Sequence, residues 1–216
     1  MTGEFRILLV CTANICRSAM AEAIARAMLA GTGLPTATGS AGVRALTGHP
    51  MAPHALATLA RLGLDGRAHR ARPLDLDLVR SADLLLTMEA GHAAVPVGLD
   101  PAAARRTFTL PEFATLASGT DERRYRSDTA ERARAIVEAA AGRRGRQPGP
   151  DIRDPYGGPP EGYDTCAQTL GESLSHALNA LLGRLPAAVT RTPRTVSTGG
   201  RGRGRAERGE GVDEWA

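Results

Sequence analysis

The opening segment of the chain constrains its fold more than any other part of the sequence. Residues 5–10 form a short apolar run, FRILLV, which is typical of a strand covered on both faces. After a short polar loop, residues 18–30 are rich in alanine and carry methionine or isoleucine at four-residue steps, which predicts a helix that ends at Gly31. A strand, a tight loop and a helix in this order open a parallel α/β unit.

Similar patterns predict the remaining elements. Further strands are expected at residues 36–41, 82–88 and 106–110, and further helices at 52–62, 129–141 and 164–185. The last of these helices carries a leucine-rich apolar stripe that includes Cys166, so this cysteine is expected in the core. A Gly/Arg/Pro linker at 142–150 and a loop rich in Pro and Gly at 151–162 precede that helix.

The end of the chain differs in composition from the rest. Beyond residue 186, Arg, Gly, Thr and Ser predominate, and large apolar side chains are almost absent. Such a segment cannot bury enough apolar surface to offset the entropy lost on ordering. We therefore expect one α/β domain over residues 1–186 and a disordered Arg/Gly-rich tail over residues 187–216.

The basic residues narrow the possible functions. All 27 are arginine, because the sequence contains no lysine. This absence excludes a Walker A nucleotide site and Schiff-base chemistry, both of which need a lysine. The net charge of +4 is small, and four acids are interleaved with the six arginines of the tail, so no nucleic-acid partner is expected.

Cysteine and histidine usage points to a free thiol and to no metal. Three cysteines cannot form a disulfide framework, and the five histidines show no zinc-ligand spacing. No signal peptide is visible, and no apolar run approaches the roughly 20 residues of a membrane span. These features predict a cytoplasmic protein without membrane insertion, in a reducing compartment.

The loop between the first strand and the first helix carries the most informative residues. Cys11 and Arg17 are separated by five residues, so the loop can close around one tetrahedral oxyanion. Backbone N–H groups of the loop and of the helix start would point inward and would also stabilise a thiolate at Cys11. Arg17 offers a planar pair of donors for two oxygens of the anion. Ser18 can donate a hydrogen bond to the thiolate, and Asn14 can tie the backbone of the loop together.

This loop resembles the signature of the low-molecular-weight protein tyrosine phosphatases, Cys-x-Gly-Asn-x-Cys-Arg-Ser. The resemblance continues in the same order over about residues 5–185, through Ser40-Ala41-Gly42, Gly48-His49-Pro50, His69-Arg70-Ala71-Arg72, Ala82-Asp83 with Met88, and Asp154-Pro155-Tyr156-Gly157. It implies a flavodoxin-like three-layer αβα sandwich with a four-stranded parallel sheet, and a phosphatase-like catalytic domain over residues 1–186.

The resemblance also implies the roles of individual residues. Cys11 would be the nucleophile that forms a phosphocysteine, Arg17 would bind the phosphate, and Asp154 would be the general acid and then the general base. The expected phosphate- and substrate-binding residues are Thr12, Ala13, Asn14, Ile15, Cys16, Ser18 and Tyr156. No metal or other cofactor is needed, because Arg17 and the N–H groups supply the electrostatics. The alternative for Asp154 is an ordinary Asp-Pro turn.

Two residues depart from the pattern of the family. Ala13 stands where the family usually has glycine, and a positive φ at that position would cost an alanine on the order of 1 kcal/mol. Glu89 follows Met88 where the family more often has aspartate. The sequence offers no interpretation of this second change.

The substrate is expected to be a phosphorylated protein. Ile15 resembles the tyrosine-directed branch of the family, whereas the phosphoarginine-directed branch has threonine there. Tyr156 is followed by Gly157 rather than by a second aromatic residue, and the segment after Gly42 offers only Leu46 as a wall for a substrate ring. This pattern resembles bacterial members that act on tyrosine kinases of polysaccharide export, so such a kinase is one expected partner.

Several alternatives remain open at this point. Cys16 could form a reversible disulfide with Cys11 or simply be a small buried side chain, and His49 and His69 are expected to be structural or on the surface. Other possible functions are a protein arginine phosphatase, a thioredoxin-coupled arsenate reductase and a non-catalytic phosphoprotein-binding module. The reductase would need two more cysteines about 70–80 residues after the first, and no cysteine lies between Arg17 and Thr165.

Overall fold

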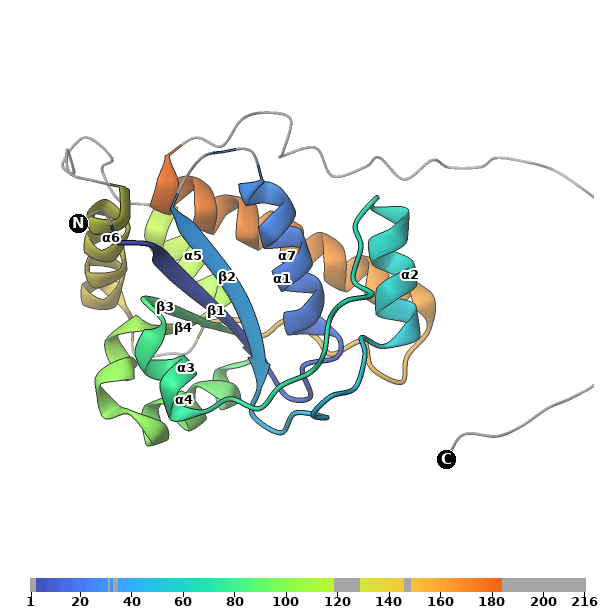
Figure 1. Cartoon of the computed structure of the whole chain (residues 1–216). Helices are drawn as coiled ribbons and strands as arrows, with labels where there is room; N and C mark the ends of the chain where they lie inside the picture. Colours follow the sequence, from blue (N-terminus) through green and yellow to red (C-terminus); the bar gives the residue numbers. More distant parts are fainter. Residues whose placement is uncertain (1–2, 31, 33–34, 119–128, 146–148, 184–216) are drawn as a thin grey trace, which may run out of the picture.

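Four parallel strands form the centre of the structure, in the order β2-β1-β3-β4 (Figure 1). This structure is a computed structural model, and it describes residues 3–30, 32, 35–118, 129–145 and 149–183. The strands are β1 (Phe5–Cys11), β2 (Thr36–Gly42), β3 (Leu84–Thr87) and β4 (Thr107–Thr109). The predicted four-stranded parallel sheet is therefore confirmed, with β3 shorter than the expected 82–88.

Apolar residues of β1 alternate between the two faces of the sheet. Ile7 and Leu9 belong to a large buried cluster on one face, and Leu8 and Val10 belong to a smaller one on the other. Successive side chains of a strand point to opposite faces, so a continuous apolar run is buried only where both faces are covered. This is the arrangement that the sequence of β1 predicts.

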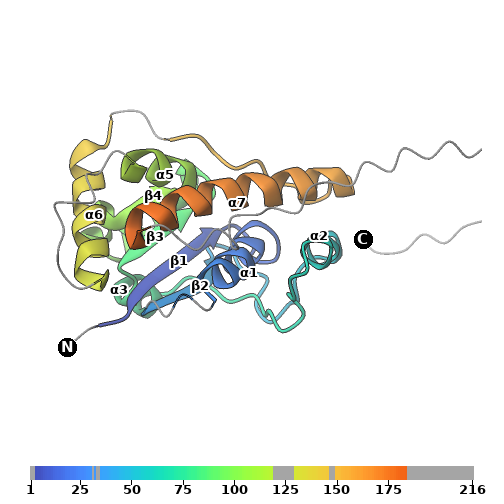
Figure 2. The ribbon, with the colours of Figure 1, turned by 90° about the horizontal axis from the view of Figure 1, so that it is seen from above.

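Helices cover both faces of the sheet, which confirms the predicted three-layer sandwich. The larger cluster lies under α1 (Arg17–Leu29), α5 (Leu110–Ser118), α6 (Thr129–Arg143) and α7 (Pro160–Leu182), and α2 (Pro53–Arg61) packs beside α1 and α7. Figure 2 shows α7 running alongside α1 and α5. The smaller cluster contains residues of α3 (Leu76–Ser81) and of the 3₁₀ helix η2 (Pro101–Arg106).

Helix α7 begins earlier than the sequence predicts. It starts at Pro160 rather than near residue 164, so part of the expected loop at 151–162 is helical. Proline is favoured in the first turn of a helix, where its missing N–H group has no partner to lose. The predicted apolar stripe is buried as expected and includes Cys166, Leu170 and Leu174. Gly183 ends the helix with a φ of 85°.

Several short elements were not predicted. These are α3, η1 (Ala90–Ala93), α4 (Ala94–Leu99), η2 and α5. For α5 the sequence carries a signal: the Thr109 N–H donates to the Glu112 carboxylate at 3.2 Å, and the Glu112 N–H donates to the Thr109 hydroxyl at 3.3 Å. This is a capping box, Thr-x-x-Glu, and it begins inside β4.

Some expectations fall on parts of the chain that the structure does not describe. The predicted helix end at Gly31, part of the linker at 142–150 and the whole tail at 187–216 lie outside the described residues. Helix α6 continues to Arg143, so the first two residues assigned to the linker are helical.

Candidate active site

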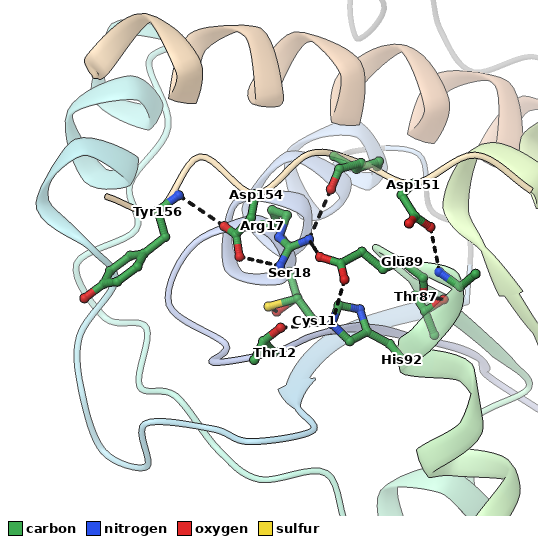
Figure 3. Close-up of polar contacts among 12 residues, drawn as sticks. Cys11, Thr12, Arg17, Ser18, Thr87, Glu89, His92, Asp151, Asp154 and Tyr156 are labelled. Carbon is green, nitrogen blue, oxygen red and sulfur yellow. Dashed lines mark hydrogen bonds and ion pairs between the residues drawn. The ribbon is translucent and has the colours of Figure 1, made fainter. Parts of the chain in front are cut away.

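The loop from Cys11 to Arg17 lies at the carboxyl end of β1, beside the point where the strand order reverses. The chain leaves β1 toward β2 on one side, and β3 lies on the other side. Ligands of open α/β sheets bind at such a switch point, because the loops on either side diverge there. Cys11 is the last residue of β1, and its sulfur lies 2.9 Å from the Ser18 hydroxyl in the first turn of α1 (Figure 3).

Asn14 holds the loop against the segments behind it. Its side-chain amide donates to the hydroxyls of Ser18 at 2.9 Å and Ser40 at 2.8 Å, and its carbonyl oxygen accepts from the Arg72 N–H at 3.0 Å. Asn14 was expected to tie the backbone of the loop to itself. The side chain instead binds the loop to the start of α1, to β2 and to the backbone at residue 72.

The left-handed backbone position of the loop is Asn14, not Ala13. Asn14 has a φ of 59° and is the only non-glycine residue with a positive φ among those described. The cost anticipated for alanine at position 13 therefore does not arise. Asparagine tolerates this conformation better than other side chains do, because its short amide can hydrogen-bond locally.

His69 supports the same loop from behind. Its Nε2 atom lies 2.7 Å from the backbone carbonyl oxygen of Asn14, and its Nδ1 atom lies 4.0 Å from the Glu22 carboxylate. Glu22 in turn accepts a hydrogen bond of 2.6 Å from Ser40. His69 therefore has the structural position expected for it.

Two carboxylates and a backbone carbonyl surround the guanidinium of Arg17. Its Nη2 atom donates to the Asp154 carboxylate at 2.5 Å, and its Nη1 atom donates to the Glu89 carboxylate and to the Ile152 carbonyl, the latter at 3.1 Å (Figure 3). Burial opposes the positive charge, but the hydrogen bond that Arg17 donates to Glu89 and the charges of Asp154 and Cys11 outweigh it and raise the pKa of Arg17. Arg17 is thus charged and held in one orientation, almost completely buried.

Glu89 is a member of this site that the sequence did not identify. Burial of the carboxyl acts to raise its pKa, but the hydrogen bond and charge of Arg17 keep the pKa of Glu89 below its ordinary value. The signal in the sequence was its place two residues after the end of β3. Carboxyl ends of parallel strands gather at one edge of the sheet, which is where the loop at Cys11 also lies.

The loop that carries Asp154 is attached to the segment after β3. The Ile152 N–H donates to the Met88 carbonyl at 2.8 Å, and the Asp151 carboxylate accepts from the Ala90 N–H at 2.7 Å. Asp154 accepts from the Tyr156 N–H at 3.1 Å through its second oxygen. Asp154 is therefore both the start of an Asp-Pro turn and a direct partner of Arg17.

A match to a sequence model of a protein family identifies the family of this chain. The sequence model described as "Low molecular weight phosphotyrosine protein phosphatase" matches residues 6–123, more than half of the chain. The chain belongs to this phosphatase family.

Relatives within and around the low molecular weight phosphatase family differ in their described activities. The probable low molecular weight protein-tyrosine-phosphatase EpsP of Ralstonia nicotianae is 41% identical over 107 residues, which are 50% of this chain and 71% of EpsP. A protein-arginine-phosphatase of Geobacillus stearothermophilus is 35% identical over 167 residues, which are 77% of this chain and 88% of that protein. An arsenate reductase of Halalkalibacterium halodurans is 31% identical over 138 residues, which are 61% of this chain and 94% of the reductase.

Solved structures of the same family share the fold. The low molecular weight protein tyrosine phosphatase from T. tengcongensis superposes with a TM-score of 0.63 at 30% sequence identity. The match covers 82% of this chain and 99% of that structure. About a fifth of this chain therefore has no counterpart there.

Two exposed apolar side chains lie on segments that border the loop from Cys11 to Arg17. Tyr156 is 64% exposed and follows Asp154, and Leu46 is 42% exposed on the loop after β2, where its N–H donates to the Ala13 carbonyl at 3.1 Å. Figure 3 shows the Tyr156 ring extending away from Arg17. Ile15, in contrast, is part of the large apolar cluster and is only 6% exposed.

The two other thiols, Cys16 in the loop from Cys11 to Arg17 and Cys166 in α7, are both buried. Cys16 directly precedes α1, and burial raises its pKa to about 12. Burial likewise raises the pKa of the Cys166 thiol to about 12. All three cysteines are free in the structure, and Cys166 occupies the core position predicted for it. At neutral pH both buried thiols are therefore protonated and poor nucleophiles.

Neither a metal site nor a membrane-spanning helix is present in the part of the chain that the structure describes. Within it, no three side chains of His, Cys, Asp or Glu are grouped closely enough to hold a metal ion. Nor does any described helix combine the length and apolar character needed to cross a membrane.

Proposed function

We propose that the chain hydrolyses phosphotyrosine in proteins, with Cys11 as nucleophile, Arg17 as phosphate ligand and Asp154 as general acid and base. The observation that carries this proposal is the contact of 2.5 Å between Arg17 and Asp154, beside the Cys11–Ser18 pair. The Cys11 thiol, the Arg17 guanidinium and the Asp154 carboxyl group thus lie together at one strand end, although Asp154 lies far from the other two in sequence.

The first step transfers the phosphoryl group to the enzyme. The Cys11 thiolate attacks phosphorus in line, an S–P bond forms, and the bond between phosphorus and the tyrosine oxygen breaks. Asp154 takes up a proton from solvent when the substrate dianion replaces it on Arg17, and it then gives this proton to the departing phenolate, so a neutral phenol leaves. Arg17 and the backbone N–H groups of Thr12, Ala13 and the following residues bind the equatorial oxygens in both ground and transition states.

The second step releases phosphate. Water attacks the phosphocysteine, the Asp154 carboxylate accepts a proton from this water, and the S–P bond breaks to restore the Cys11 thiolate. The Ser18 hydroxyl, 2.9 Å from the sulfur, stabilises the thiolate as it leaves. Neither step requires a metal ion, because the charge of Arg17 and the N–H groups balance the charge of the phosphoryl group.

Exposed apolar surface beside the loop supports an aryl substrate. Tyr156 and Leu46 offer two partly exposed side chains against which a phosphotyrosine ring can pack. Ile15 can contribute only the small part of its surface that is not in the core. We further propose that the substrate is a cytoplasmic phosphoprotein, with a tyrosine kinase of polysaccharide export as the first one to test.

A protein arginine phosphatase is the second candidate function. The protein-arginine-phosphatase of G. stearothermophilus matches a larger share of this chain, 77%, than EpsP does, 50%. An acidic group that protonates a leaving nitrogen would serve a phosphoarginine equally well. An arsenate reductase has less support, because the pair of further cysteines that such an enzyme uses is missing. A binding module without turnover would not need Asp154.

Turnover of defined substrates separates these functions. The purified full-length protein is assayed on phosphotyrosine, phosphoarginine and phosphoserine peptides, and on arsenate in a thioredoxin-coupled reaction. We expect phosphotyrosine to be the best substrate and turnover to persist in EDTA. Preference for phosphoarginine supports the second candidate, and no turnover of any substrate supports the binding module.

Two substitutions test the proposed roles. Cys11→Ser should abolish turnover while phosphate still binds. Asp154→Ala should slow hydrolysis of phosphotyrosine, which has a poor leaving group, by about 10²–10⁴-fold and slow p-nitrophenyl phosphate much less. Glu161→Ala, which removes an exposed carboxylate from the first turn of α7, serves as the matched control and should not change this dependence on the leaving group. Full activity of Cys11→Ser, or a requirement for Mg²⁺ or Zn²⁺, would refute the mechanism.

A further inference from the structure

His92 connects the oxyanion loop (residues 11–17) to Glu89, the carboxylate that orients Arg17. Its Nε2 atom lies 2.9 Å from the Thr12 hydroxyl and 3.8 Å from the Glu89 carboxylate (Figure 3). The residue is 6% exposed, and its Nδ1 atom is buried without a hydrogen-bond partner among the described residues. A contact path therefore runs from Thr12 through His92 and Glu89 to Arg17.

Charged groups from three segments face this imidazole. Glu89 lies next to it on the segment after β3, Arg17 comes from α1, and Asp151 and Asp154 come from the loop that precedes α7. Burial has the largest effect and lowers the pKa of His92 below its ordinary value of 6.5; Arg17 acts in the same direction, while the three carboxylates act in the opposite one. In the free protein at neutral pH, His92 is accordingly uncharged.

We propose that His92 is a positioning residue that takes up a proton from solvent when a dianion binds between Cys11 and Arg17, so that oxyanion affinity falls as the pH rises. This inference rests on the proposed function, because it requires that the loop binds oxyanions. It adds a residue and a pH dependence that the catalytic roles of Cys11, Arg17 and Asp154 do not contain.

The physical reason is the charge that the ligand adds. A dianion in the loop places two negative charges beside Thr12, one hydrogen bond from the imidazole, and so favours the protonated ring. Protonated Nε2 donates to the Thr12 hydroxyl and attracts the nearer Glu89 oxygen, while the other Glu89 oxygen keeps its bond to Arg17. One carboxylate then bridges both cations, and the loop and Arg17 are held in the geometry that the anion needs.

The direction of the pH effect follows from this linkage. The ligand raises the pKa of His92, so the bound protein carries more protons than the free protein over the interval between the two pKa values. The affinity for the oxyanion is highest below the pKa of His92 in the free protein, which is under 6.5. It declines as the pH rises, until the pH exceeds the pKa of His92 in the protein with the anion bound. Above that point the contribution of His92 charge is lost.

Sulfate binding provides the test, because sulfate stays a dianion across the whole range and is not hydrolysed. Its Kd is measured for the full-length Cys11→Ser protein from pH 5 to pH 8 at constant ionic strength, so that titration of the thiol does not contribute. We expect the Kd to increase about fivefold or more over this range. In Cys11→Ser/His92→Gln, whose amide can keep the bond to Thr12 but cannot be protonated, the increase in Kd should be clearly smaller, because only the linkage through Asp154 remains. Cys11→Ser/His176→Gln, which alters an exposed histidine of α7, is the matched control and should behave like Cys11→Ser.

A direct measurement of the imidazole keeps the test decisive if the His92 variant does not fold. The ring ¹⁵N shifts of His92 in Cys11→Ser are followed with pH, with and without sulfate, and sulfate should move the titration to higher pH. An unchanged titration, or equal pH dependence of the Kd in the Gln variant, overturns the inference and leaves the proposed function standing. Failure of sulfate to bind at any pH overturns both.

Discussion

At the scale of single residues, the backbone of the oxyanion loop is decided by Asn14. Its φ of 59° is a conformation that costs most side chains roughly 1–2 kcal/mol, and three hydrogen bonds of its buried amide offset that cost. Ala13, beside it, has no such strain. An alanine in place of the usual glycine is therefore compatible with the loop.

Substitutions at Asn14 and Ala13 separate backbone strain from hydrogen bonding. Asn14→Ala loses the three bonds and keeps the unfavourable φ, so we expect it to lower the free energy of unfolding by about 3 kcal/mol. Asn14→Gly loses the same bonds without the strain and should be about 1 kcal/mol more stable than Asn14→Ala. Urea unfolding measures both.

Ala13→Gly is the matched control for this series. It should leave turnover essentially unchanged and reduce stability by about 0.5–1 kcal/mol, because glycine adds entropy only to the unfolded chain. A large gain in turnover for Ala13→Gly would contradict the conformation of the loop described above.

At the scale of elements, the end of β2 determines how closely the oxyanion loop can approach the sheet. A Cβ atom at Gly42 would lie 2.6 Å from the Thr12 carbonyl oxygen and 3.1 Å from the Ala13 carbonyl carbon. These are backbone atoms, which cannot move without displacing the loop. The pairing of Cys11 with Gly42 in the parallel sheet places this small residue opposite the nucleophile.

Gly42→Ala should therefore disturb the site more than the fold. We expect a loss of about 1–3 kcal/mol in the free energy of unfolding and a decrease in kcat/KM of about a hundredfold, because Thr12 and Ala13 shift relative to Arg17. Gly98→Ala, where a Cβ meets no atom within 4 Å, is the control and should leave kcat/KM unchanged. If both variants were equally active, the close approach of the loop to Gly42 would not be needed for catalysis.

At the scale of the whole molecule, one long helix joins the parts of the larger cluster. Helix α7 contacts α1, α2, α5 and α6, and its buried leucines extend to Leu182 at its end. Nearly the whole of the solved T. tengcongensis phosphatase, 99% of it, superposes on 82% of this chain. The fold therefore does not depend on every segment present here.

Truncation tests the domain boundary expected from composition. A chain that ends at residue 186 should retain the Tm and kcat/KM of the full chain, since the residues after it carry few apolar side chains. A chain that ends at residue 176 loses the buried Leu178, Leu181 and Leu182 and should fail to fold cooperatively. Thermal unfolding and activity report both results. A lower Tm in the first truncation would show that the tail contributes to the folded domain.

Much of the fold and part of the site could be predicted from local patterns. The strand, loop and helix at residues 5–30 are specified by neighbouring residues, because hydrophobic periodicity and glycine positions act over a few residues. Short helices such as α3 and α4 span too few turns for a period to be recognised. Helix α5 could have been found from its capping box, but its first turn directly follows β4 and the two patterns merge.

The sequence by itself determined the family, the class of fold and the Cys11–Arg17 loop, since these depend on a contiguous motif and on the alternation of apolar residues. The resemblance already assigned Asp154 to the site, but only the tertiary structure decided that Glu89 and His92 lie beside that loop and that Asp154 contacts Arg17 directly. They come from segments 70 to 140 residues along the chain, whose meeting depends on the order of the strands. Partners brought together by sheet topology leave no periodic signal in the sequence, because each contact is set by the path of the chain and not by spacing along it.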